Sequence, residues 1–153
     1  MKINRVRLLL PIIWMIIIFS FSCQPGKTSS DTSLEVGMFI GDVFYPGFEQ
    51  LETADQEQFA QNIQLVVRKT AHVMEYTILM WCFLFAFKGN KVWYALAFTV
   101  AYACTDEFHQ LFVSGREGKL LDVIIDSSGA LLGLLLFYII KSIYIKISCQ
   151  HKD

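Results

Sequence analysis

The side chains that could do chemistry gather in three short stretches of this chain. The first, Arg68–Tyr76, holds two cations, an imidazole, a carboxylate and a phenol, and it leads into an almost entirely apolar run from Thr77 to Phe87. A membrane interior disfavours an ionisable side chain by roughly 2.5–3.5 kcal/mol at a helix centre on insertion scales. Ionisable groups beside such a run generally face a protein interior, so they indicate a functional site.

Helical spacing groups these side chains into sets, because residues three or four apart share one face of a helix. Arg116 lies in a loop between two glycines. This loop can bring its planar guanidinium over these side chains, where it can donate hydrogen bonds to a carboxylate or a phosphate. The sets are Arg68, His72, Glu75 and Tyr76; then Asp106, His109 and Gln110, with Glu107 beside them; and finally Asp122 and Asp126.

The composition indicates a membrane protein of one domain. The chain has 153 residues, of which 54% are hydrophobic and only 18% charged, and its mean hydropathy is +0.45. A typical soluble domain is less apolar and more charged. The net charge of −1 gives no reason to expect nucleic acid as a partner. Four widely spaced cysteines without a Cys-x-x-Cys pair favour neither a disulfide framework nor a thiolate zinc site.

Four apolar runs predict an all-α fold, a polytopic membrane protein built as a four-helix transmembrane bundle. A spanning helix needs about 20 mostly apolar residues, with a range of about 17 to 25. In the outer loop at 23–69, a Ser/Thr-rich linker at 28–33 precedes apolar positions from Phe48 to Val66 that predict an amphipathic helix at the membrane surface. The predicted spans of this single domain, 1–153, are about 6–22, 70–87, 92–112 and 122–140.

Two of these spans carry further signals. The basic start and short apolar core of the first also describe a signal peptide, and Ser20–Cys23 resembles a poor lipoprotein cleavage box. We expect this helix to be retained, with cleavage or lipidation as the alternative. In the fourth span, Gly129 and Gly133 form a small-xxx-small pattern, which predicts that another helix packs closely there.

The positive charges predict the orientation. Most of the thirteen lysines and arginines lie in the N-terminal segment, the turn at 88–91 and the C-terminal tail, so both termini are expected to face the cytoplasm. The three polar sets then lie at the opposite end of the spans. At about 1.5 Å of rise per residue, all of them fall within roughly 10 Å of the outer boundary. This depth predicts one polar pocket in the outer leaflet, open outward.

The ordered motifs resemble those of the VanZ-like membrane proteins, a family named for a protein linked to low-level resistance to the glycopeptide teicoplanin. The resemblance implies a multi-pass protein of the bacterial cytoplasmic membrane with this topology, and it supplies no settled reaction. Cys23 stands where a serine is usual, a departure expected to leave the pocket motifs untouched. The motifs are Phe21-Ser22-Cys23-Gln24-Pro25, Arg68-Lys69-x-x-His72-x-x-Glu75-Tyr76, Asp106-Glu107-x-His109-Gln110, Gly115-Arg116 and Asp122-x-x-x-Asp126-x-x-Gly129.

One interpretation of the pocket is an enzyme that hydrolyses or transfers a group on a membrane lipid or a lipid-linked cell-wall precursor. Its imidazoles and carboxylates could act as general acid and base, or could bind a divalent metal, the one cofactor that the residues leave open. The candidate catalytic residues are His72, Glu75, Asp106, Glu107, His109, Asp122 and Asp126, and the candidate substrate-binding residues are Arg68, Tyr76, Gln110 and Arg116.

Two other interpretations need no reaction. The pocket could bind a lipid head group or a lipoglycopeptide, with aromatic side chains receiving the acyl part. Alternatively, the polar residues could be interhelical hydrogen bonds that fix the register of the bundle. Gln110, Ser127 and Tyr76 fit such packing roles individually, and Lys69 and Lys119 fit head-group anchors.

Overall fold

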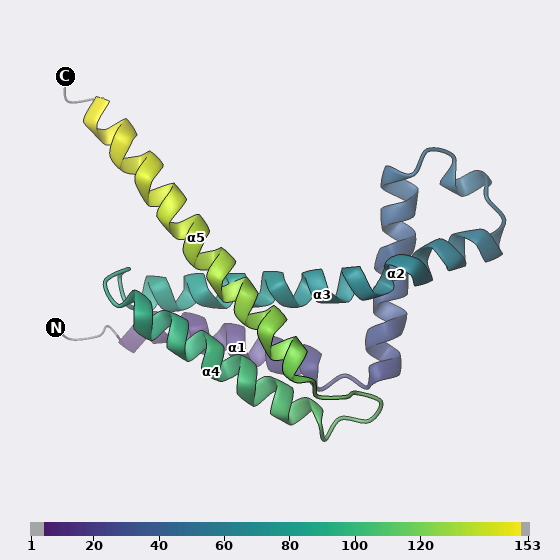
Figure 1. Ribbon diagram of the computed structural model, residues 1–153, viewed down its shortest axis with the longest axis horizontal. Coiled ribbons are helices and arrows are strands. Elements are labelled where there is room, and N and C mark those ends of the chain that lie inside the picture. Colours follow the sequence, from purple (N-terminus) through teal and green to yellow (C-terminus); the bar gives the residue numbers. More distant parts are fainter. Residues whose placement is uncertain (1–4, 151–153) are drawn as a thin grey trace.

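The computed structural model describes residues 5–150, and within that range helix is the only regular secondary structure. The predicted all-α fold is confirmed. Lys2 and Lys152, which contribute to the positive-charge pattern, lie outside the described residues. The elements, shown in Figure 1, are η1 (Arg5–Leu8), α1 (Leu9–Ser22), α2 (Gly26–Phe44), η2 (Phe48–Gln50), α3 (Thr53–Ala86), α4 (Val92–Gln110) and α5 (Leu120–Gln150).

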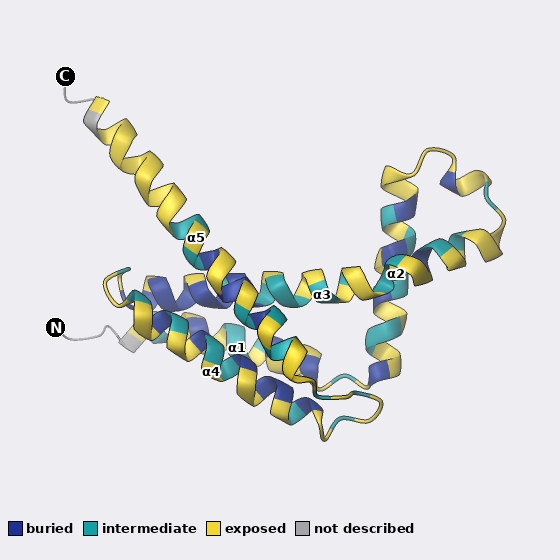
Figure 2. Ribbon diagram, in the orientation of Figure 1, coloured by how far each residue is buried: buried dark blue, intermediate teal, exposed yellow. Residues whose placement is uncertain are grey.

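The long helix α3 is the centre of the fold, since α1, α2, α4 and α5 all pack against it. The N-terminal end of the described chain and the α3–α4 turn lie at one end of the molecule, while α2 and the α4–α5 loop lie at the other (Figure 1). The apolar core lies along the second half of α3, where Figure 2 shows most of the buried surface. Fully buried core side chains include Ile18, Tyr76, Leu79, Met80 and Ala130.

Close packing of α3 on α5 depends on two glycines, as the small-xxx-small pattern predicts. A Cβ atom on Gly129 would lie 2.4 Å from the Val73 carbonyl oxygen, and one on Gly133 would lie 2.9 Å from that of Thr77. The side chains of Thr77 and Trp81 donate hydrogen bonds of 2.9 and 2.8 Å to the carbonyl oxygens of the same two glycines. The two backbones therefore touch, which fixes the polar first turns of α5 beside α3.

The predicted surface helix and second span are one helix. α3 runs for 34 residues from Thr53, about 51 Å at the usual rise, without a break near residues 66–70. No glycine or proline lies between 53 and 86, so nothing in the sequence ends the helix there. Of the apolar positions that predicted a separate amphipathic helix, those from Ala54 to Val66 lie in the first half of α3, which packs partly on α2, while Phe48 lies in η2.

Helix α2 is the main element that the sequence did not predict. The composition predicts a linker at residues 28–33, which lie in the first half of α2, and glycines outside a predicted helix often mark turns. Instead, Gly37 and Gly41 are buried on one helical face, where a Cβ would lie 3.1 Å from Ala60 and 2.5 Å from the Phe48 ring. These glycines allow close approach rather than a turn. α2 runs at 101° to the helix that precedes it.

One helix of the described chain, Leu120–Ser148 within α5, is long and apolar enough by itself to cross a membrane. The bent pair Val6–Ser22 and Gly26–Phe44 passes the same test only when taken together. Only 22% of the most apolar stretch of α5 is buried, and the helix continues to Gln150, past the predicted end of the fourth span at 140. α1 and α4 coincide closely with the predicted first and third spans. A bundle of four membrane spans stays a prediction.

Candidate functional site

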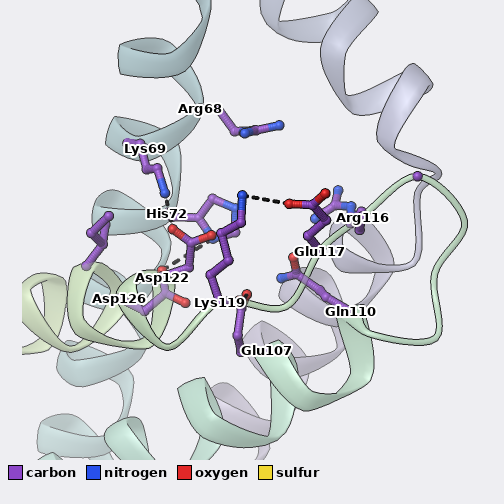
Figure 3. Close-up of a pocket in the computed structure, with 12 residues that line it drawn as sticks. Arg68, Lys69, His72, Glu107, Gln110, Arg116, Glu117, Lys119, Asp122 and Asp126 are labelled. Atoms are coloured by element: carbon purple, nitrogen blue, oxygen red, sulfur yellow. Dashed lines mark hydrogen bonds and ion pairs between the residues drawn. The ribbon is translucent and has the colours of Figure 1, made fainter.

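A polar cavity of about 430 Å³ lies where α3, α4, α5 and the α4–α5 loop meet, at the end of the molecule that carries α2 (Figure 3). Its lining combines lysines and arginines with four acids, of which Glu107 and Asp126 are buried. Seven of the predicted site residues line it: Arg68, His72, Glu107, Gln110, Arg116, Asp122 and Asp126.

Asp126 and His72 form the inner part of the site, on α5 and α3. The Asp126 side chain is 1% exposed, and its Oδ1 lies 3.4 Å from His72 Nδ1. That separation is longer than a normal hydrogen bond, and neither Asp126 oxygen accepts a hydrogen bond from a described residue. Leaving a buried polar group unpaired costs roughly 1–3 kcal/mol, and more for a charged group. This aspartate therefore lowers the stability of the fold where it stands.

Glu107, on the opposite wall, accepts a hydrogen bond on only one of its two carboxylate oxygens. Its Oε1 accepts a 2.6 Å hydrogen bond from the backbone N–H of Lys119, at the start of α5, while the buried Oε2 has no partner among the described residues. This bond ties the last turn of α4 to the α4–α5 loop. Glu107 and Asp126, two carboxylates on facing helices, thus line the cavity and hold buried oxygens that accept no hydrogen bond from a described residue.

Four cations line the same cavity, and they differ in what they contact. Lys69 pairs with Asp122, and Lys119 pairs with Glu117 across 2.7 Å at the exposed rim. The hydrogen bond between Lys119 and Glu117 raises the pKa of the ammonium and lowers that of the carboxyl. Arg68 makes no hydrogen bond or ion pair with any residue that the structure describes. The cavity therefore holds at least one guanidinium that is free to bind an anion.

Arg116 is fixed in place by its loop. Its Nε and Nη2 donate hydrogen bonds to the carbonyl oxygens of Gln24 (2.9 Å) and Phe21 (3.0 Å) at the end of α1. The loop itself docks on α2, because the Gly26 N–H donates to Ser114 and a Cβ on Gly26 would lie 1.9 Å from the Gly115 carbonyl oxygen. Burial lowers the pKa of the Arg116 guanidinium from its usual value. A guanidinium held by Nε and one Nη2 hydrogen keeps both Nη1 hydrogens and the second Nη2 hydrogen for a ligand.

The predicted single pocket is in fact two cavities. Glu75 lines a second space of about 250 Å³ between α1, α2 and α3, and not the larger cavity. Arg68, His72 and Arg116 line both. These three side chains therefore form a shared wall.

Three predicted site residues line neither cavity. Asp106 is buried and accepts hydrogen bonds on Oδ2 from the Ser22 hydroxyl (2.7 Å) and the Gln110 amide (3.1 Å). Tyr76 lies in the apolar core, 6.4 Å from the Tyr102 ring. The His109 ring lies against the Phe19 ring of α1, with the two ring centroids 4.6 Å apart. They occupy contacts between helices.

Cys23, at the position where a serine is usual, contacts one of the motif residues. Its Sγ lies 3.4 Å from Nε2 of His109, so the residue at the usual serine position contacts a motif histidine. The sequence separation of 86 residues hides this contact, because nothing in helical spacing relates α1 to α4.

Side chains that could hold a metal do not converge. Within residues 5–150, no three His, Cys, Asp or Glu side chains come close enough to bind a metal ion together. The two cavities and the α1–α4 contact divide these donors between them. The residues therefore do not fit the divalent metal that the sequence left open.

Sequence reasoning missed part of the cavity lining. Lys69 and Lys119 were expected to be head-group anchors, and Glu117 was given no role, yet all three line the larger cavity. Lys69 follows Arg68 directly and lies three residues before His72, which was the available signal.

Comparison with known proteins gives one match. A family model described as VanZ/LLP1 matches residues 7–141, which include every residue that lines the two cavities. No curated protein and no solved structure matches the chain.

Proposed function

The chain belongs to the VanZ/LLP1 family of membrane proteins, and we propose that it is an envelope enzyme that hydrolyses the phosphate head group of a membrane lipid or lipid-linked cell-wall precursor. The site is the larger cavity, with Asp126 and His72 as its reacting pair and the guanidinium groups as its anion holders.

The proposal includes a topology of four spans, about 6–22, 70–87, 92–112 and 122–140, with both termini cytoplasmic. Outward-facing apolar side chains on every one of these segments support it, among them Ile13, Phe98 and Leu135, since water would disfavour such a surface. The N-terminal end and the Lys88–Lys91 turn share one end of the molecule, opposite the cavity (Figure 1). Alkaline phosphatase fused at Pro46 should be active and fused at Asn90 inactive; the reverse pattern would contradict this orientation.

One observation carries the enzymatic proposal: the buried Asp126 carboxylate accepts no hydrogen bond and lies 3.4 Å from an imidazole at the wall of a cavity. A polar cluster that only fixed helix register would be expected to satisfy its own groups, as Asp106 does at Oδ2, although its Oδ1 has no partner among the described residues. An unpaired buried acid facing a cavity is instead typical of a group kept for a reaction.

The arrangement suits general base catalysis by His72. With Nδ1–H directed at Asp126, Nε2 is left to accept a proton from a water molecule as the water oxygen attacks phosphorus. The bond between phosphorus and the ester or anhydride oxygen breaks, and the imidazolium returns the proton to that leaving oxygen. Water is the only co-reactant, and the products are inorganic phosphate and a lipid with one phosphate fewer. Asp126 stabilises the imidazolium that forms in between.

The cations suit the phosphate. Arg68 and Arg116 present planar donors, the geometry that phosphate oxygens accept in pairs. Lys69 and Lys119 add positive charge at the rim, although each already has an acidic partner. Charge that develops on the phosphoryl oxygens during the reaction would therefore meet donors already in position.

The test uses the full-length protein in nanodiscs with phosphatidic acid, polyprenyl phosphate or polyprenyl pyrophosphate. Inorganic phosphate and the shortened lipid are measured together. We expect turnover on at least one lipid, lost in Asp126→Asn and His72→Gln and kept in Asp42→Asn, an exposed carboxylate of α2 outside both cavities. Saturable binding without product would favour the binding interpretation, and equal turnover in all three variants would refute the proposed roles.

A further inference from the structure

The smaller cavity, of about 250 Å³, lies on the other side of His72 from the proposed phosphate site. It opens between the end of α1, the first half of α2 and the middle of α3. Because Arg68, His72 and Arg116 line both cavities, a ligand held by these three side chains can extend into either space. The smaller cavity is therefore placed to receive a second part of the same ligand.

The walls of the smaller cavity are mainly hydrocarbon. Phe21, Val36, Val67 and Ala71 contribute apolar surface from three helices. Two of its four serine and threonine hydroxyls, on Thr32 and Ser33, donate to carbonyl oxygens of their own helix, and the Ser22 hydroxyl donates to Asp106. The Thr32 hydroxyl, for example, donates to the Thr28 carbonyl oxygen at 3.0 Å. A hydroxyl that already donates to its own helix does not need a polar partner on a ligand, so these residues present a nearly apolar face.

The same face of α2 continues outward as an apolar stripe. Val36, Phe39 and Val43 follow one another at helical spacing and are 41%, 65% and 53% exposed. α2 stands at 101° to the preceding helix, so if α1 crosses the membrane, α2 lies along its surface. Val36 belongs both to the stripe and to the cavity wall. The stripe thus connects the smaller cavity with the surrounding bilayer.

We propose that the smaller cavity receives the hydrocarbon chain of the lipid whose phosphate occupies the larger one. The substrate class is then a phosphate-headed amphiphile that enters sideways from the bilayer beneath α2. This inference rests on the proposed function for the head group and adds the chain site and the entry route. The side chain of Glu75, the one acid of the smaller cavity, makes no hydrogen bond or ion pair with a described residue and lies beside His72 in the wall of that cavity.

The test is photo-cross-linking in nanodiscs with the full-length protein. The probes are phosphatidic acid with a diazirine in its acyl chain, the matching diacylglycerol, and a polyprenyl phosphate with a photoreactive chain. We expect adducts on peptides that contain Phe21, Val36 and Ala71, roughly tenfold more from the phosphatidic acid than from diacylglycerol, since the phosphate supplies the binding energy. Whichever probe labels more strongly, the acyl or the polyprenyl one, identifies the type of hydrocarbon chain. Either result supports a phosphate-headed amphiphile as the substrate class.

Filling the cavity provides the matched variants. Ala71→Phe places a ring in the smaller cavity, while Ala97→Phe adds the same ring at an exposed alanine of α4 outside both cavities. We expect Ala71→Phe to lower the adduct yield roughly tenfold and Ala97→Phe to leave it unchanged. Thr32→Leu, from the α2 wall, serves as a second filling variant if Ala71→Phe does not fold. Equal labelling by diacylglycerol, or equal loss in both phenylalanine variants, would overturn the proposal.

The outcomes also separate this inference from the proposed function. Asp126→Asn should keep the adducts, because the chain site lies in the other cavity. Adducts in a protein without turnover would refute the enzyme and keep the chain site. Turnover that depends on Asp126, with adducts spread evenly over the outward-facing residues of α5, would refute the chain site alone.

Discussion

Two buried aspartates, Asp106 and Asp126, lie in different regions of this molecule and show how burial can serve two purposes. Asp106, where α4 meets α1, accepts hydrogen bonds from Ser22 and Gln110. Asp126, where α5 meets α3, accepts none and faces a cavity. Both are at most 2% exposed, so burial does not distinguish them. Their hydrogen bonds distinguish them: those of Asp106 join α4 to α1, while Asp126 has none with a described residue, and we propose that it acts on a ligand.

The comparison predicts opposite effects on turnover and stability for variants of the two aspartates. The largest effect, a loss of turnover, is expected at Asp126. Asp126→Asn removes the charge beside His72 and should lower turnover on a phosphate-headed lipid by roughly 10²–10⁴-fold, the usual contribution of a positioned acid–base pair. Thermal stability should change little, because the Asp126 carboxylate accepts no hydrogen bond that the substitution would remove. Turnover and melting temperature are measured on the same nanodisc preparation. A variant that loses stability but keeps turnover would erase the distinction.

At Asp106 we expect stability to fall instead. Asp106→Ala leaves the Ser22 hydroxyl and the Gln110 amide unpaired in the interior, at a cost of roughly 1–3 kcal/mol each. Membrane abundance and melting temperature should therefore drop, while turnover per folded molecule changes little. Thr105→Ala, the exposed neighbour whose hydroxyl bonds only to the Tyr102 carbonyl oxygen, is the control and should be near neutral. A normal melting temperature with lost turnover would place Asp106 in the reaction.

The sequence predicts some of the helices and the end of the molecule at which the polar residues gather, but not which polar residues join helices and which line a cavity. The apolar runs predict α1, α4, the second half of α3 and the first half of α5, and helical spacing gathers the polar groups at one end. The spacing does not say how the helices are rotated about their axes. Asp106, His109 and Asp126 therefore look alike in the sequence, although they face α1 in two cases and the cavity in the third.

Helix α2 shows a second limit. Glycines at 37 and 41 are ambiguous in a sequence, because the missing side chain suits both a turn and a close helix contact. The structure shows that these glycines serve a close helix contact, because Ala60 and Phe48 lie directly opposite them. Without α2, the smaller cavity has no outer wall, so the sequence predicted one pocket where the fold has two.

A smaller effect is expected at Arg116, which belongs to both regions. Its hydrogen bonds to Gln24 and Phe21 tie the loop to α1, while its remaining donors face the cavities. Arg116→Lys keeps the charge but loses the fork geometry. We expect roughly tenfold weaker binding of a phosphate-headed lipid, about 1.4 kcal/mol, with a small loss of stability. The affinity for the lipid is measured by titration in nanodiscs at two salt concentrations, with Lys27→Arg as the control. An unchanged affinity would mean that Arg116 has only a structural role.

The smallest effect is expected at Cys23, which sharpens the comparison because it stands in the Asp106 region beside Ser22. Its thiol is exposed and lies 3.4 Å from His109 Nε2, and a serine hydroxyl can contact the same nitrogen. Cys23→Ser should therefore change stability by no more than about 0.5 kcal/mol and leave turnover within roughly twofold. Turnover and melting temperature of the two proteins, compared side by side, check this. A loss of turnover as large as that of Asp126→Asn would mean that the α1–α4 contact reacts with the substrate, and the two regions would then form one site.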